Sequence, residues 1–135
     1  MDFYNQLLAQ KLGGGGGAYK YDAFKARTDT SINNVTAQML QGISDITDYA
    51  FNYCTSLASI EIPNSVTNIE NGAFYNCTSL SSVTVEATNP PTLGGSTFGI
   101  DANLTIYVPA ESVDTYKAAS GWSNYASKIQ AIPSD

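Results

Sequence analysis

Histidine is absent from the chain, and only 13% of its 135 residues are charged. Without histidine there is no Ser-His-Asp triad, no Cys-His nucleophile pair and no histidine ligand for a metal. The longest apolar runs are only a few residues long, too short to cross a bilayer. The first residues lack a basic stretch followed by an apolar one, so no signal peptide is visible. We therefore expect cytoplasmic synthesis without the usual secretion route, and no membrane insertion.

Positive charge is missing from the middle of the chain. No lysine or arginine lies between Arg27 and Lys117, and the net charge is −6. Nucleic acids and anionic membranes are bound largely through cations, so neither is an expected partner. The 12 acidic residues show no pairing beyond that of a solvated surface. We expect no enzyme activity, and catalytic residues, cofactor and metal are all predicted to be none.

The middle of the chain contains an internal sequence repeat. Residues 46–68 and 69–91 match at an offset of 23, with conservative changes at apolar positions. Each unit contains Leu-x-x-Ile/Val-x-Ile/Val, whose alternation predicts a short strand with one buried face. A single coil cannot bury its own apolar side, so neighbouring coils must stack into a parallel sheet with one exposed face. The shared positions are Ile46/Ile69, Ala50/Ala73, Phe51/Phe74, Cys54/Cys77, Leu57/Leu80, Ile60/Val83 and Ile62/Val85.

The register continues more weakly in both directions. Ile106 and Val108 follow Val83 and Val85 by 23, whereas Phe98 follows Phe74 by 24, so that turn holds one extra residue. Upstream, Met39, Ile43 and Ile46 precede Ile62, Val66 and Ile69 by 23. We count about four turns, two clear and two degenerate, as expected when end coils cap an open core. Ala-Phe, at residues 50–51 and 73–74, is interpreted as a short helical or 3₁₀ turn.

The repeat Ala-Phe-x-x-Cys-Thr-Ser-Leu-x-Ser-Ile/Val-x-Ile/Val, followed by residues 62–69, resembles the BspA-type leucine-rich repeats of bacterial surface proteins. Residues 107–117 with Gly121-Trp122 resemble the C-terminal cap of that family. The resemblance implies a β-rich solenoid of short parallel strands and helical turns, used for adhesion or protein interaction, without catalytic residues. Ordinary leucine-rich repeats place Asn or Cys where this chain has Ser65 and Thr88, a departure from that pattern.

The C-terminal residues have a different pattern. Apolar Val113, Tyr116 and Ala119 have helical spacing between Pro109 and Gly121, which predicts a short capping helix from Glu111 to about Ser120. We expect Trp122 and Tyr125 to cover the last coil, and Ile129 and Ile132 to form a final strand.

The N-terminal residues are predicted to form an anchor and a hinge. Residues 1–12 give an expected helix with an apolar stripe, formed by the candidate anchor residues Phe3, Tyr4, Leu7 and Leu8. Five glycines follow at 13–17. The segment FYNQLLAQKLGGGGG also resembles N-termini of phage and prophage structural proteins that display BspA-like domains. The alternative is a helix that folds back to cap the solenoid.

The predicted domains are an anchor helix at 1–12, a pentaglycine hinge at 13–17, an N-terminal cap or degenerate repeat at 18–45, repeats at 46–109 and a C-terminal cap at 110–135. The two cysteines are expected to be buried free thiols on adjacent coils, although a disulfide between them is sterically conceivable. The candidate binding face is the outward row of the strands, formed by Gln38, Glu61, Thr84, Tyr107, Ser59, Ser82 and Thr105.

Two functional hypotheses follow from this layout. The first is a non-enzymatic structural and interaction module on a larger assembly, a phage virion or a prophage-encoded surface component, attached through residues 1–17. The second is a free-standing bacterial surface adhesin that binds a protein or a glycan. Either way the location is a virion or an extracellular surface, and residues 1–12 could also join copies into a homo-oligomer.

Overall fold

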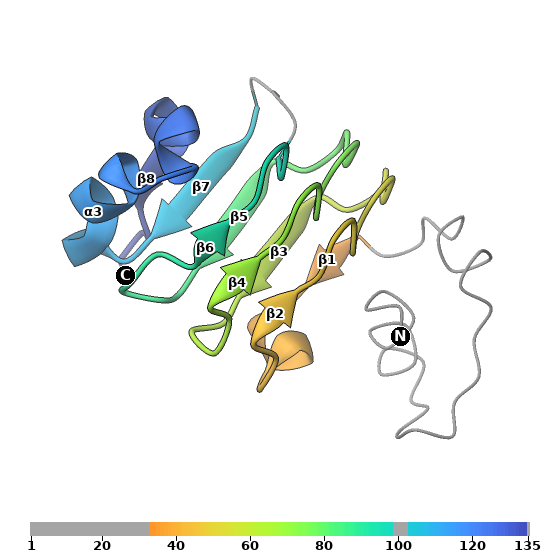
Figure 1. Ribbon diagram of the computed structural model, residues 1–135, viewed down its shortest axis with the longest axis horizontal. Helices are drawn as coiled ribbons and strands as arrows, with labels where there is room; N and C mark the ends of the chain where they lie inside the picture. The colour runs from red at the N-terminus through yellow and green to blue at the C-terminus, as the bar shows by residue number, and fades with distance from the viewer. Residues whose placement is uncertain (1–32, 99–102, 135) are drawn as a thin grey trace.

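The chain winds into a solenoid whose first three coils each contribute one strand to each of two parallel sheets (Figure 1). The computed structural model describes residues 33–98 and 103–134. Sheet A has five strands in the order β1-β3-β5-β7-β8, and sheet B has three in the order β2-β4-β6. Their bounds are Asn34–Val35 (β1), Asp45–Ile46 (β2), Ser59–Ile62 (β3), Asn68–Ile69 (β4), Ser82–Val85 (β5), Thr92–Leu93 (β6), Thr105–Val108 (β7) and Ile129–Ala131 (β8).

The strand register confirms the 23-residue period. Glu61 pairs with Thr84, and Thr84 pairs with Tyr107, as the repeat predicts. In sheet B, Ile46 pairs with Ile69, in agreement with the upstream extension of the repeat. The extra residue is also present, because Phe74 bridges Phe98 at an offset of 24. The leucine-rich-repeat solenoid is therefore confirmed in its register.

The first strand departs from that period, and the position predicted for Gln38 is wrong. β1 pairs Asn34 with Ser59, an offset of 25. The strand stops there because Thr36 caps the 3₁₀ helix η1 (Ala37–Leu40), its side chain accepting the N–H of Met39 at 3.4 Å. Gln38 lies inside η1, outside the strand column that contains Glu61.

The Ala-Phe segments form i→i+3 turns, within the predicted range of a short helical or 3₁₀ turn, and no continuous helix forms there. Between residues 49 and 54 the backbone N–H groups donate alternately to carbonyls of the next coil and to carbonyls three residues back in the same turn. Phe51 N–H donates to the Ala73 carbonyl of the next coil at 2.7 Å, whereas Asn52 N–H donates to Tyr49 within the turn at 3.1 Å. A 3₁₀ helix needs consecutive i→i+3 hydrogen bonds. It cannot form here because every second N–H group donates to the neighbouring coil instead. The same coil-to-coil bonding produces sheet B, which the single predicted sheet did not include.

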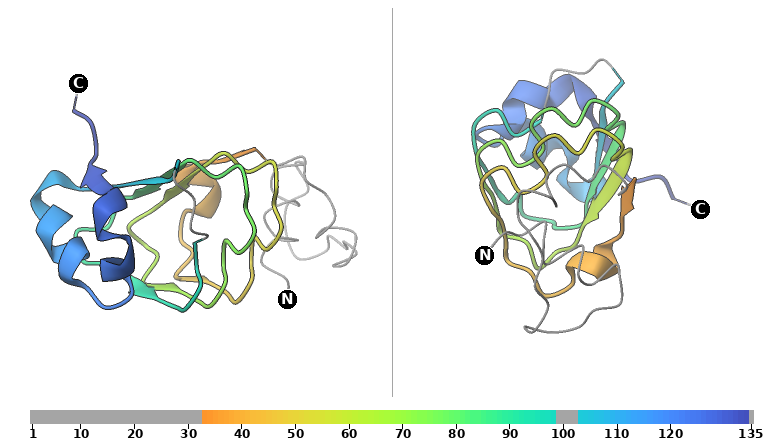
Figure 2. Two further views of the ribbon diagram at one scale, coloured as in Figure 1. Left: turned by 90° about the horizontal axis from the view of Figure 1, so that it is seen from above. Right: turned by 90° about the vertical axis from the view of Figure 1, so that its right-hand side faces the viewer.

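Phenylalanine rings form the centre of the core between the sheets. Phe51 stacks on Phe74 with centroids 5.3 Å apart, and Phe74 stacks on Phe98 at 5.4 Å. Seen along the solenoid, the coils overlie one another (Figure 2). Phe51, Phe74 and Phe98 all belong to the buried core inside them. Equivalent residues therefore occupy equivalent sites in successive coils, which is why the apolar positions of the repeat vary so little.

A helical cap closes the C-terminal end, with an α-helix shorter than the one predicted from Glu111 to about Ser120 and a final strand that ends before Ile132. The cap consists of η2 (Ala110–Ser112), α3 (Val113–Ala118), η3 (Trp122–Lys128) and strand β8. Trp122 and Tyr116 are fully buried and meet edge to face at 5.1 Å. Trp122 Nε1–H donates to the Pro91 carbonyl at 2.8 Å, so the indole nitrogen is satisfied inside the core. The cap thus covers the apolar end of the last coil, at the blue end of Figure 1.

The predicted anchor and hinge, residues 1–12 and 13–17, lie outside the described residues, as do residues 18–32 of the predicted N-terminal cap. Among the residues that the structure describes, no helix has the length and apolar character needed to cross a membrane.

Candidate functional site

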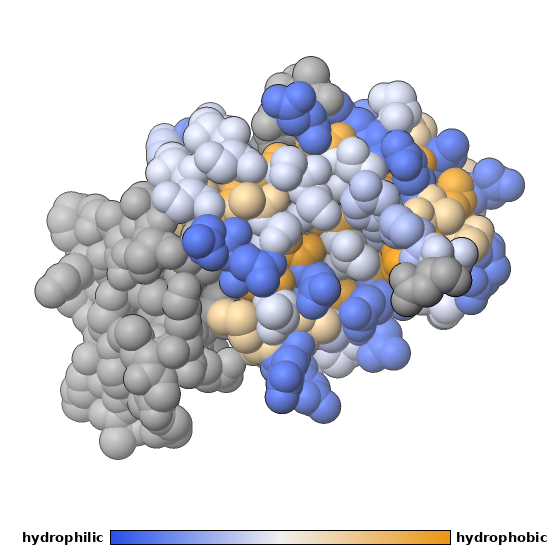
Figure 3. All heavy atoms as spheres, turned by 180° about the vertical axis from the view of Figure 1, so that it is seen from behind, coloured by the Kyte–Doolittle hydropathy of each residue, from blue (hydrophilic) through white to orange (hydrophobic). Residues whose placement is uncertain are grey.

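The outward side of sheet A carries two columns of polar side chains. Along β3, β5 and β7 the inward residues are buried, and the residues between them are exposed or half-buried. One column contains Glu61, Thr84 and Tyr107, and the second contains Ser59, Ser82 and Thr105. The structure brings these six predicted residues together in register. Seen from the side opposite to Figure 1, the surface is mainly polar, with small apolar areas between (Figure 3).

The first column loses Gln38 at one end and extends one strand beyond Tyr107 at the other. Gln130, on β8, pairs with Tyr107 and is exposed. It was missed because the cap interrupts the repeat between β7 and β8. The signal was nevertheless present, since Ile106 and Ile129 are again 23 residues apart and Gln130 follows Tyr107 by the same interval.

The two ends of this face differ in how their side chains are bonded. Glu61 Oε1 accepts the Ala37 N–H at 3.0 Å, which holds the start of η1, and Ser59 hydrogen-bonds Asn34. Thr84 and Tyr107 make no side-chain hydrogen bond within the part of the chain that the structure describes. The central and C-terminal part of the face is therefore the part whose polar groups can bond a partner.

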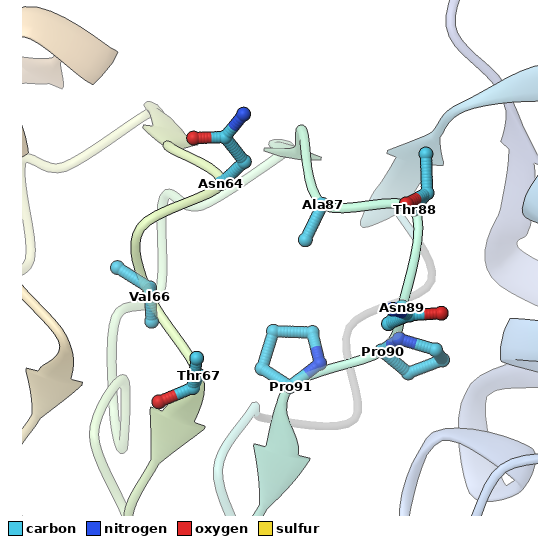
Figure 4. A pocket seen from close by; sticks show the side chains of 8 residues that line it. All are labelled: Asn64, Val66, Thr67, Ala87, Thr88, Asn89, Pro90 and Pro91. Carbon is cyan, nitrogen blue, oxygen red and sulfur yellow. The ribbon is translucent and has the colours of Figure 1, made fainter.

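A hollow lies between two successive turns that lead from sheet A to sheet B (Figure 4). Its volume is about 290 Å³, and Ala87 and Pro91 project toward it. The extra residue opens it: Asn68 pairs with Thr92 at an offset of 24, so the second turn is longer than the first. The lining residues are Asn64, Val66, Thr67, Ala87, Thr88, Asn89, Pro90 and Pro91.

The cap holds the outer turn of this hollow from the other side. Tyr116 OH donates to the Ala87 carbonyl at 2.6 Å, and Ser112 OH donates to the Thr88 carbonyl at 2.8 Å. With the indole bond to Pro91, three cap side chains fix one short turn. The hollow is thus pre-formed, although no charged side chain lines it to orient a ligand.

Three exposed tyrosines form a separate surface on the turns that lead from sheet B back to sheet A. We call Tyr49, Tyr53 and Tyr75 the tyrosine ridge; they expose 45%, 52% and 42% of their surface. Tyr75 meets Tyr49 edge to face at 6.4 Å and Tyr53 edge to face at 6.2 Å. These are the large hydrophobic residues that are exposed among the described residues.

Two tyrosines of the ridge have a backbone conformation that is unfavourable for tyrosine. Tyr49 has φ +56° and Tyr53 has φ +62°, in the left-handed region. The equivalent positions of the second coil hold Gly72 and Asn76, at φ +62° and +61°. Glycine and asparagine tolerate this region, whereas other residues are strained by about 1–2 kcal/mol. The first coil therefore retains its two tyrosines at a cost in stability.

The neighbouring coil is shaped to receive one of these rings. A Cβ on Gly72 would lie 2.6 Å from Tyr49 Cδ1 and overlap the ring. Sequence reasoning did not find this surface, because the ridge residues are the positions where the two coils differ. The available signal was the pairing of Tyr49 with glycine and of Tyr53 with asparagine, both residues typical of the left-handed region.

Both cysteines are buried and are not joined by a disulfide, in agreement with the expected thiols on adjacent coils. Cys77 S–H donates to the Phe51 carbonyl at 3.0 Å, and burial raises the pKa of the Cys77 thiol to about 12. A thiol of this kind stays protonated at neutral pH and is a poor nucleophile and metal ligand. Among the residues that the structure describes, no group of three acidic, cysteine or histidine side chains is placed to hold a metal ion.

The fold defines a class, the leucine-rich-repeat solenoids. The family model for the BspA type leucine rich repeat region (6 copies) matches residues 20–130. The chain belongs to this family. A search of curated proteins gave no match. Leucine-rich-repeat domains generally mediate protein–protein interaction and are typically non-enzymatic, and BspA-like proteins are usually surface-associated. The chain is thus a protein-interaction or surface module.

Proposed function

We propose that the chain is a non-enzymatic display module that binds a protein partner with the outward side of sheet A. The observation that supports this most directly is the pair of in-register polar columns on sheet A, the first of which continues from Thr84 through Tyr107 to Gln130. Small hydroxyl side chains beside a tyrosine make an adaptable contact surface, with the aromatic ring as its anchor.

The rigidity of the scaffold adds to this argument. The inward residues of β3, β5 and β7 are almost completely buried, so the outward side chains have little freedom to rearrange. A surface that is ordered before binding loses less conformational entropy when a partner docks. The low charge of the columns, where Glu61 is the single ionisable acid, also avoids the desolvation cost of burying ions.

Site-specific photocrosslinking from this face tests the proposal. A crosslinking residue at Thr84 is expected to capture one defined protein on the assembly or surface that carries the chain. Thr92, exposed on sheet B, is the matched control. With the captured protein purified, Tyr107→Ala should weaken binding about fivefold or more, because aromatic anchors dominate interface energies. Glu61→Gln keeps the acceptor for Ala37 and should change affinity little. Equal capture from Thr84 and Thr92 would contradict the proposal.

We further propose that residues 1–17 attach this module to its carrier, a phage virion or a prophage-encoded surface component. The support is in the sequence: the apolar stripe of Phe3, Tyr4, Leu7 and Leu8 is followed by five glycines. Glycine-rich linkers in general join an attachment segment to a displayed domain without fixing their orientation. The stripe could equally join copies of the chain into a homo-oligomer.

Truncation separates these possibilities. We expect a version that starts at Ala18 to be excluded from the carrier, and normal incorporation would contradict the attachment. Light scattering across a concentration series then shows whether residues 1–17 also join copies of the chain: an oligomer of the full chain and a monomer of the truncation would show that they do. The alternative is a free-standing adhesin for a protein or a glycan, which predicts neighbouring genes for secretion or sorting in place of virion genes.

A further inference from the structure

We propose that the tyrosine ridge binds a positively charged segment of a protein partner, through cation–π contact with arginine or lysine side chains. The inference takes from the proposed function only that the partner is a protein. It concerns a different side of the solenoid, since the ridge lies on the turns between sheet B and sheet A and not on the strands.

The tyrosine ridge is held in place by contacts from two coils. Its three rings come from two coils and contact one another edge to face. Gly72 leaves the space that the Tyr49 ring occupies, and Tyr49 and Tyr53 hold a strained backbone where the next coil has residues suited to it. Strain that a fold retains clusters at binding surfaces, because relieving it would remove the side chains that bind.

The described coils around the ridge carry negative charge. From residue 33 to residue 98 the chain has five carboxylates and neither lysine nor arginine. Two of the carboxylates adjoin the ridge: Glu70 Oε1 accepts the Asp48 N–H at 3.1 Å, and Asp48 Oδ1 accepts the Asn71 N–H at 3.0 Å. The Asn71 carbonyl in turn accepts the N–H of Tyr49 at 3.0 Å. Aromatic faces inside a negative field attract cations.

The same field argues against a neutral glycan as the occupant. Sugar rings also stack on tyrosine, but an uncharged ligand gains no net electrostatic attraction from the carboxylates of Asp48 and Glu70 described beside the ridge. An anionic ligand would be repelled, because the basic residues described by the structure are Lys117 and Lys128 in the C-terminal cap. A cationic peptide uses both the rings and the field, so we commit to that class.

The test is an NMR titration of the full chain with ring-labelled tyrosine. The probe is an alternating Gly-Arg peptide, and the matched controls are Gly-Glu and Gly-Ser peptides of the same length and maltotriose. We expect the ring signals of Tyr49, Tyr53 and Tyr75 to shift with the Gly-Arg peptide alone. Tyr107 and Tyr125 serve as internal references. Added salt should weaken the binding, because part of the attraction is between exposed charges.

Variants make the result quantitative. Tyr75→Leu should weaken binding about two- to fivefold, which corresponds to one exposed cation–π contact, and Tyr75→Phe should stay within about twofold because the ring remains. Replacing all three rings by leucine should cost at least about tenfold. Asp48→Asn keeps the acceptor for Asn71 while removing the charge, and should also weaken binding. Thermal unfolding of each variant confirms that the solenoid remains folded.

Each remaining outcome overturns the inference. Ring shifts with Gly-Ser peptide or maltotriose equal to those with Gly-Arg would make the ridge a surface for neutral ligands. Unmoved rings at millimolar Gly-Arg peptide would mean that it binds no cation. The outcome is independent of the proposed function, because Tyr107→Ala removes the anchor of sheet A and should leave peptide binding to the ridge unchanged.

Discussion

The first coil, residues 46–68, and the second, residues 69–91, share their buried residues and differ on the surface at the positions of the tyrosine ridge. Both bury phenylalanine, cysteine, leucine and two β-branched residues at matching positions. On the surface, tyrosine in the first coil faces glycine or asparagine in the second. Stacking explains the contrast, because a buried side chain must fit the same site in the coil below and the coil above. An exposed turn residue contacts fewer neighbours, so its identity can differ between coils and can be determined by the binding of a partner.

The largest expected effect tests whether the two coils are equivalent inside. Phe51→Ala and Phe74→Ala each remove a stacked ring from the core, and each should lower the free energy of unfolding by about 3–5 kcal/mol. Urea denaturation followed by circular dichroism measures both. Because the rings stack on each other at 5.3 Å, the double variant should cost less than the sum. A loss below about 1 kcal/mol at either site would break the equivalence.

The next effect concerns the position where the coils differ most. Gly72→Ala should cost about 2–3 kcal/mol, because alanine is strained at φ +62° and its Cβ displaces the Tyr49 ring. In a Tyr49→Ala background the same substitution should cost only about 1 kcal/mol, the backbone strain alone. A double-mutant cycle of unfolding free energies measures the difference. Identical costs in both backgrounds would show that the ring does not press on Gly72.

The third prediction uses the thiol of the second coil. In the folded chain burial holds the pKa of Cys77 at about 12, against an ordinary value of 9.0. Above pH 9 the unfolded chain therefore releases a proton that the folded chain keeps, so stability falls as pH rises and stops falling near pH 12. The expected loss is about 1.4 kcal/mol per pH unit, or about 2 kcal/mol at pH 10.5.

Burial also raises the pKa of Tyr116, which adds to the same trend above about pH 10. Cys77→Ala should flatten the dependence between pH 9 and 12 relative to the native chain, while Tyr116 keeps its own share. Unfolding free energies at several pH values provide the slope of each variant. A Cys77→Ala slope that equals the native slope would contradict the assignment.

The smallest effect tests the tie between the second coil and the cap. Tyr116→Phe removes the 2.6 Å bond to the Ala87 carbonyl and should cost about 1–2 kcal/mol. Faster amide exchange should be confined to the turn at 86–92, and the equivalent turn of the first coil, at 63–68, should be unchanged. Uniform acceleration across both turns would mean that the cap stabilises the solenoid as a whole.

The repeat was enough to predict the buried half of the molecule. Ile60, Val83 and Ile106 align because a shared core enforces one period, and the sequence records that period directly. Gln38 was misplaced because a capping threonine ends β1, a local hydrogen bond that competes with the period. The tyrosine ridge escaped notice for a related reason: its residues are a departure from the repeat, and a repeat is found by what recurs.

The common register has a consequence for how such a module changes length. β3, β5 and β7 pair one to one at intervals of 23 residues. An inserted unit of 23 residues would therefore pack against an equivalent coil on each side. The cap would still close the far end. Duplication of a coil would then extend the module by about 4.8 Å, the spacing between neighbouring strands. The length of the solenoid is thus set by the number of repeats, independently of the surface residues that determine which partner binds.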